Sequence, residues 1–94
     1  MTILHSTSGV FAATGQSAEV TGRGVSFGMT FAGTATVTLE YFDLGLNAWR
    51  TARSYTATPA NPPVVIEDLV QRRWRFNCTA YTNNVTYELK SGLR

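Results

Sequence analysis

The stretch Arg72–Thr82, RRWRFNCTAYT, alternates polar and apolar side chains. Every second residue from Trp74 to Ala80 is apolar, and the residues between them are Arg, Asn and Thr. Successive side chains of a β-strand point to opposite faces, so a period of two is typical of a half-buried strand. The stretch therefore predicts a β-strand with one row of side chains in a core and one row outside it.

The same period recurs through most of the chain, together with the Thr, Val, Tyr and Phe content that strands favour. No segment shows the period of a helix. The predicted strands are Ala18–Thr21, Val25–Phe31, Val37–Tyr41, Ala48–Tyr55, Val64–Glu67, Arg73–Ala80 and Val85–Leu89.

Turn-forming segments rich in Gly, Asn and Pro separate these strands, as at Ala32–Thr34, Thr58–Pro63 and Thr82–Asn84. Strands at this spacing predict an all-β fold, a small antiparallel β-sandwich of about seven strands, immunoglobulin-like or jelly-roll-like, over residues 16–94. The predicted core consists of Val25, Phe27, Phe31, Val37, Leu39, Tyr41, Trp74, Phe76, Cys78, Val85, Tyr87 and Leu89.

Residues 1–15 differ from the rest and consist largely of Ser, Thr, Gly and Ala. We predict that they form an extended N-terminal arm. A purely disordered tail needs no large apolar residues, yet this segment includes Ile, Leu, Val and Phe. We therefore predict that Ile3, Leu4, Val10 and Phe11 contact a partner.

The composition indicates one small domain that associates with others. The chain has 94 residues, of which 44% are hydrophobic and only 15% are charged. About a quarter is the usual charged share of a soluble domain, so the low value favours a surface partly covered by partners. The N-terminus lacks the pattern of a signal peptide, and no apolar run is long enough for a membrane span.

The residue types needed for catalysis are scarce. One Cys and one His, Cys78 and His5, supply neither a metal site nor a catalytic triad. Glu67 and Asp68 are adjacent, so a strand would point them to opposite faces, whereas paired carboxylate chemistry needs them to converge. We predict a protein without enzymatic activity, cofactor or metal.

Nucleic-acid binding is the first alternative, because basic and aromatic residues interleave near Trp74. On a strand, however, Arg73 and Arg75 face away from Trp74 and Phe76, so they form no common stacking platform. The net charge of +2 is also too small for strong binding to phosphates. These arginines are predicted either to pair internally with Glu40, Glu67 or Glu88 or to contact a partner.

A carbohydrate-binding module is the second alternative. Trp49 and Tyr55 are predicted to share a partly exposed strand face with Thr51 and Arg53. Aromatic side chains on such a face can bind sugars, whereas a bulge in this hairpin would invert the facing. We include Trp49 and Arg53 among the predicted partner contacts.

Three segments resemble a group of small bacteriophage virion proteins. They are ATGQSAEVTGRG (13–24), FAGTATVTLEYFDLGLNAW (31–49) and WRFNCTAYTNNVTYEL (74–89). The hairpin here is longer than the Asp-Gly-Gly form of that group, and Asn83–Asn84 stands where Ser-Gly is common. The resemblance implies a β-sandwich and a structural role in a virion.

The function expected on these grounds is that of a capsid decoration or cement protein, made in the host cytoplasm and located in the virion. It would bind the major capsid protein and form a homo-oligomer, for which we favour a trimer. The alternatives are a tail or fibre component and the carbohydrate-binding module at a host surface.

Overall fold

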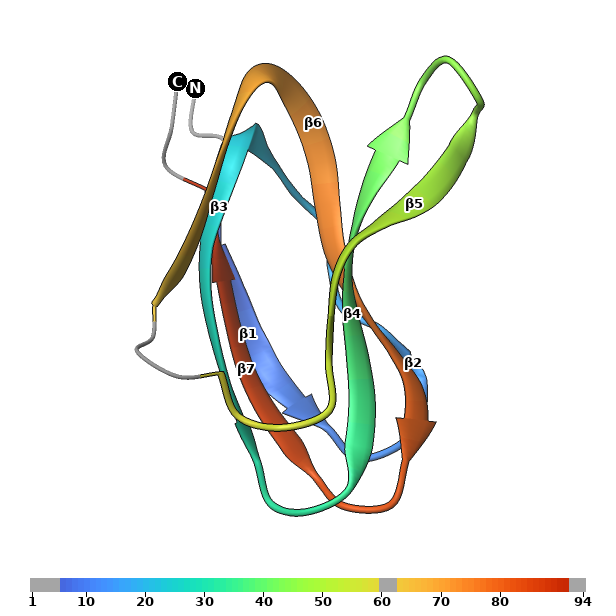
Figure 1. The fold of residues 1–94 in the computed structure, drawn as a ribbon, viewed down its shortest axis with the longest axis vertical. Helices are drawn as coiled ribbons and strands as arrows, with labels where there is room; N and C mark the ends of the chain where they lie inside the picture. The colour runs from blue at the N-terminus through green and yellow to red at the C-terminus, as the bar shows by residue number, and fades with distance from the viewer. Residues whose placement is uncertain (1–5, 60–62, 92–94) are drawn as a thin grey trace.

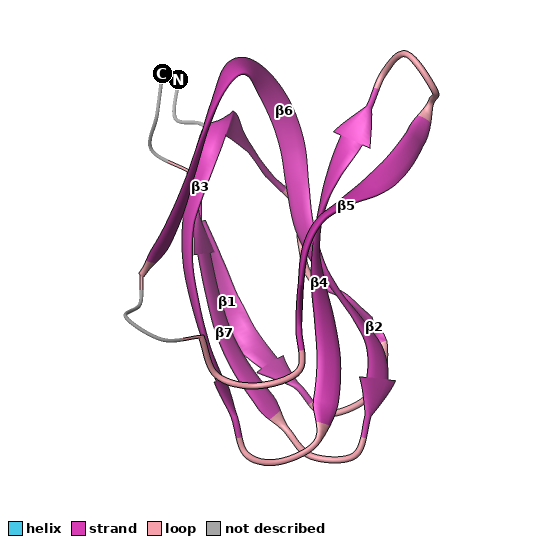
Figure 2. Cartoon of the chain, in the orientation of Figure 1, coloured by secondary structure: helices cyan, strands magenta, loops and turns pink. Residues whose placement is uncertain are grey.

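The computed structural model describes residues 6–59 and 63–91, and all regular structure within them is β-strand (Figure 2). The strands belong to one antiparallel sheet, so the all-β prediction is confirmed. They are β1 (Ser6–Phe11), β2 (Gly15–Gln16), β3 (Val20–Phe31), β4 (Ala35–Asp43), β5 (Ala48–Tyr55), β6 (Val64–Tyr81) and β7 (Val85–Lys90).

The strand order is β1-β7-β3-β6-β4-β5, and β2 also pairs with β6. Two long strands at the centre, β3 and β6, each join two of the strands that the sequence predicts. Gly22 pairs with Arg72 but Gly24 pairs with Glu67, so a single residue of β3 stands opposite residues 68–71 of β6. This bulge bends the pair, as bulges generally bend strands.

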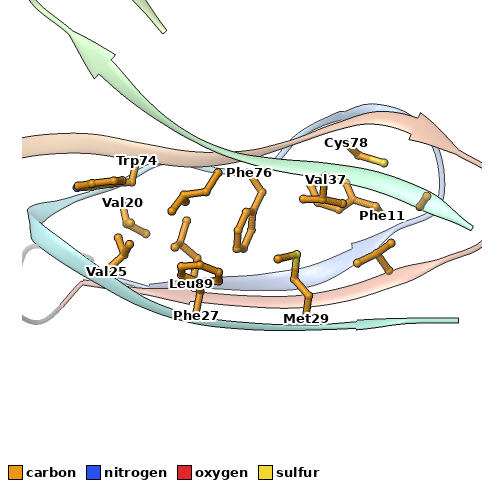
Figure 3. Packing of buried hydrophobic residues seen from close by; sticks show 13 residues of the cluster. Phe11, Val20, Val25, Phe27, Met29, Val37, Trp74, Phe76, Cys78 and Leu89 are labelled. Atoms are coloured by element: carbon orange, nitrogen blue, oxygen red, sulfur yellow. The ribbon is translucent and has the colours of Figure 1, made fainter. Parts of the chain in front are cut away.

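The bend folds the sheet back on itself, so that β1 and β7 lie on one side of the core and β4 on the other (Figure 1). Figure 3 shows the buried side chains between these two halves. The predicted β-sandwich is therefore not shown as such, because the strands form one continuous sheet. The cause is that β3 and β6 run through both halves and keep the sheet continuous.

Phe76 of β6 lies at the centre of this core and is completely buried. Its ring makes edge contacts with Phe27 from β3 and Tyr87 from β7, with ring centroids 5.5 and 5.7 Å apart. Nine predicted core residues are buried, while Phe31, Tyr41 and Tyr87 are partly buried and pack against them. The core also includes four residues that the prediction omitted: Phe11, Val20, Met29 and Ala35.

The predicted N-terminal arm is wrong for the residues that the structure describes. β1 pairs with β7 along its whole length, from Ser6 opposite Lys90 to Phe11 opposite Val85. Phe11 stacks on Tyr87 with ring centroids 4.6 Å apart and belongs to the core. Residues 6–11 and Gly15 are thus part of the sheet, whereas Ile3 and Leu4 lie outside the described residues.

Candidate functional site

The outer face of the half-sheet β6-β4-β5 carries a cluster of arginines and aromatics. The Arg73 guanidinium lies 4.5 Å from the centre of the Phe42 ring and 5.3 Å from that of Trp49. The Arg75 guanidinium lies 4.0 Å from the Trp49 ring. Stacking of guanidinium on an indole is favourable because the ring face is electron-rich. We call Phe42, Trp49, Arg73 and Arg75 the cation–aromatic face.

Both arginines of this face also form ion pairs within the chain. Arg75 Nε donates to Glu40 at 2.8 Å, and the amide of Asn77 donates to the other carboxylate oxygen at 3.2 Å. Arg73 donates to both carboxylate oxygens of Glu19, at 2.9 and 3.2 Å. Each positive charge therefore has a negative partner, and the face offers little net charge to a polyanion.

The structure corrects one premise of the argument against nucleic acid. Arg73 and Arg75 do face away from Trp74, but they meet aromatic rings that come from β4 and β5.

The prediction of which β5 side chains share a face is also wrong. Leu39 pairs with Arg53 and Glu40 with Thr51, so a bulge at Ala52 shifts the alternation. Tyr55 consequently points inward, to an edge contact with Phe27, while Trp49 lies on the outer face.

The β4–β5 hairpin extends beyond the body of the sheet (Figure 1). Its turn is held by Asp43, whose Oδ1 accepts the backbone N–H groups of Gly45 at 2.9 Å and Leu46 at 3.3 Å. Asn47 takes the left-handed conformation, with φ of 53°, which Asn tolerates better than most residues. The turn is therefore locally fixed by the Asp43 side chain and the Asn47 backbone.

The fixed turn displays two leucines to solvent. Leu44 is 81% exposed and Leu46 is 60% exposed. A cleft of about 380 Å³ lies beside Leu44, and its lining includes Phe42, Leu44 and Val70 from the bulge of β6. Arg72 and Arg73 also line it. We call the apolar group Phe42, Leu44, Leu46 and Val70 the hairpin-end surface.

The predicted partner contacts do not form one site. Val10 is about half exposed on β1, and Phe11 is buried in the core, so Phe11 is no surface contact. Trp49, Arg73 and Arg75 come together in the cation–aromatic face, whereas Arg53 is exposed further along β5. The hairpin-end surface was not predicted from the sequence, although two leucines in the turn sequence DLGLN (43–47) could have indicated an exposed apolar surface.

Cys78 is buried on the core side of β6. Burial raises the pKa of its thiol above the ordinary value, although a contact with the Ala80 carbonyl partly opposes this. A thiol that is harder to ionise is a poorer nucleophile. Among the side chains that the structure describes, no three of His, Cys, Asp or Glu gather as a metal site would require.

Glu19 gives the cation–aromatic face a pH dependence. The hydrogen bonds from Arg73 hold the pKa of the Glu19 carboxyl below its ordinary value of 4.5. A lowered pKa in the folded state stabilises the fold above pH 4.5, and this contribution is lost as the pH falls through the folded-state pKa. We expect Glu19→Gln to lower the thermal midpoint at pH 7, because it removes the ion pair with Arg73. The effect should be small, since the side chains of Arg73 and Glu19 are both over 40% exposed.

The difference between the two proteins should close as the pH is lowered to about 2, when both carry a neutral side chain at this position. Thermal unfolding followed by circular dichroism at several pH values measures it. Glu88→Gln, which removes an equal charge from an exposed pair with Lys90, is the control. A difference that persists unchanged into acid would mean that the ion pair is not its cause.

Comparisons with known proteins do not identify this site. The described residues contain no helix of the length and hydropathy that crossing a membrane requires. Comparison of the chain with protein-family models, with curated proteins and with solved structures finds no match.

Proposed function

We propose that this protein is a non-enzymatic structural component of a bacteriophage particle, of the capsid decoration or cement type. In this role it self-associates and binds the major capsid protein of the shell. The observation that carries the proposal is the hairpin-end surface, where Leu44 and Leu46 stand exposed on a fixed turn and Leu44 lines a cleft together with Phe42 and Val70. The resemblance of the sequence to small virion proteins supplies the biological setting.

The physical argument rests on the cost of exposed leucines. A turn is ordinarily polar, and a contiguous apolar patch on a soluble protein is typical of an interaction surface. The surface is also preorganised, because Asp43 fixes the turn before any partner arrives. Binding to such a surface loses little conformational entropy, which favours a small protein that must dock on a large shell.

The test is sedimentation of particles from an infected culture through a density gradient, with an antibody against this chain. We expect the chain in the particle band at a fixed ratio to the shell protein. Replacing Leu44 and Leu46 together with Ser should weaken rebinding to stripped particles by about tenfold or more, because well-packed leucines are worth about 1 kcal/mol or more each.

Val65→Ser is the matched control, since Val65 is also an exposed apolar residue, at 56%, but lies outside the lining of the cleft. It should bind as the unmodified chain does. A chain found only in the soluble fractions would contradict the proposed function. Gold-labelled antibody on tails rather than on shells would replace it with the tail or fibre role.

A second candidate function, a carbohydrate-binding module, is favoured by the cation–aromatic face. Trp49 lies there beside Arg75, which donates a hydrogen bond to Glu40. One feature opposes it, because the Arg75 guanidinium already stacks on the Trp49 ring at 4.0 Å. A sugar would compete with that contact for the indole.

Tryptophan fluorescence separates this candidate from the first. Trp74 is buried, so a bound sugar would act on the emission of Trp49. If the module is correct, neutral or acidic glycans should shift the emission, and Trp49→Ala should abolish the shift. A flat titration over a broad glycan set would remove the candidate.

A further inference from the structure

The strands at the rims of the sheet differ in how they are protected. An unpaired strand edge invites another strand, and proteins block such edges with charges, prolines and bulges. β5 carries Arg50 and Arg53 and a bulge at Ala52. The first part of β6, beside β3, follows Pro63 and ends in Glu67. Each of these edges therefore carries at least two protective features.

β1 has none of these features. Its sequence, STSGVF, contains no charge and no proline, and its register with β7 is regular from end to end. Only β7 pairs with it among the described strands. Its outer side chains are Ser6, Ser8 and the half-exposed Val10. β1 thus has one edge that no described strand covers and nothing in its own sequence to repel a second strand.

We infer that β1 is the self-association edge of this protein, and that it pairs antiparallel with β1 of a second copy across a two-fold axis. The charges on the two edges favour pairing of two copies through β1 rather than through β5. Pairing β5 with β5 of a second copy would bring arginines of like charge together, whereas β1 brings only uncharged residues. This inference rests on the self-association in the proposed function and replaces the trimer expected from the sequence with a dimer.

The alternation of side chains restricts the register. Thr7, Gly9 and Phe11 point toward the core, and directly paired residues of antiparallel strands must share a face. One residue of β1 must therefore pair with its own copy, and the two-fold axis lies midway between these two copies. The longest overlap within β1 is obtained when Ser8 pairs with Ser8 or Gly9 pairs with Gly9 of the second copy. Both registers place the Ser8 side chains of the two copies close together on the outer face.

The solution mass of the full chain is the first test. Light scattering on a sizing column should give about 20.6 kDa, twice the 10.3 kDa of one chain, at high concentration. A single six-residue edge is a small interface, so the dissociation constant should lie on the order of 10 µM to 1 mM. A monomer at all concentrations to about 1 mM, or a trimer, would overturn the inference.

Nitroxide labels locate the interface. Ser8→Cys labels β1, and Thr51→Cys labels β5 at the other edge of the sheet, while the native Cys78 is buried. We expect strong spin–spin broadening in the dimer for the label at Ser8 and none for the label at Thr51. The reverse pattern would place the interface at β5 and overturn the inference.

Lysine substitutions give the corresponding affinity test. Ser8→Lys puts like charges near the axis and should weaken the dimer by up to about fivefold. It should preserve the fold, because Ser8 is exposed and stands opposite Glu88. Thr51→Lys should leave the dimer unchanged. Rebinding of the Ser8→Lys variant to stripped particles reports shell binding separately, so loss of the dimer and failure of the proposed function are distinguishable.

Discussion

Phe76→Ala is expected to lower the free energy of unfolding by about 3–5 kcal/mol, the usual cost of truncating a buried Phe. Phe76 is fully buried, and its ring touches Phe27 and Tyr87 on the opposite half of the sheet. Truncation would leave a cavity between the two halves, because strands joined through shared hydrogen bonds cannot simply move together. A domain of this size has about 5–14 kcal/mol in total, so the variant should be marginal or unfolded.

Urea unfolding followed by the fluorescence of Trp74, two residues away in the same core, measures this loss. Val65→Ala is the matched control. It removes apolar atoms from the same strand, but Val65 is 56% exposed, so no cavity forms and the cost should be about 1 kcal/mol or less. Equal losses for the two variants would contradict the central place of Phe76 in the core.

The strands that could be predicted from the sequence are those that alternate strictly. The inner positions from Val37 to Tyr41 in β4, from Trp74 to Cys78 in β6 and from Val85 to Leu89 in β7 all hold apolar residues that belong to the core or pack against it. What could not be predicted is that strands join. Gly22 and Gly24 look like breaks, yet in β3 they sit opposite the bulge of β6 and let one strand serve both halves of the sheet.

β1 escaped prediction because its inner row is incomplete. Its inner residues are Thr7, Gly9 and Phe11, and only the last is apolar. A β-carbon at Gly9 would lie 3.0 Å from the Tyr87 hydroxyl oxygen, so the tyrosine of the neighbouring strand occupies the space that an apolar side chain would take. The pattern of β1 makes sense only with β7 beside it, and no single strand contains that information.

The cation–aromatic face escaped for a related reason. Its members are distant in sequence and meet because Glu40 stands opposite Arg75 and Phe42 stands opposite Trp49. Both pairings depend on register, and each strand pair contains a bulge that shifts it. Alternation within one strand separates Arg75 from Trp74 correctly, but it does not reveal the aromatic ring supplied by the neighbouring hairpin.

Glu40→Ala is expected to cost about 2–3 kcal/mol of unfolding free energy, more than any exposed ion pair in the described residues. Glu40 accepts hydrogen bonds from both Arg75 and Asn77. The side chains of Glu40 and Arg75 are only 12% and 20% exposed, so removing the carboxylate leaves a poorly solvated guanidinium against the Trp49 ring. The penalty arises mainly from that stranded charge rather than from the lost attraction.

A double-mutant cycle with Arg75→Met tests this cause, because Met keeps much of the apolar stem while removing the charge. Once the guanidinium is absent, Glu40→Ala should cost less, giving a coupling free energy of about 1–2 kcal/mol. Glu88→Ala, which breaks the exposed pair with Lys90, should cost about 0.5 kcal/mol or less. If Glu40→Ala costs no more than Glu88→Ala, the outer face is held by its aromatic contacts alone. The arginines would then be available to a ligand at little cost to the fold, which would strengthen the carbohydrate-binding candidate.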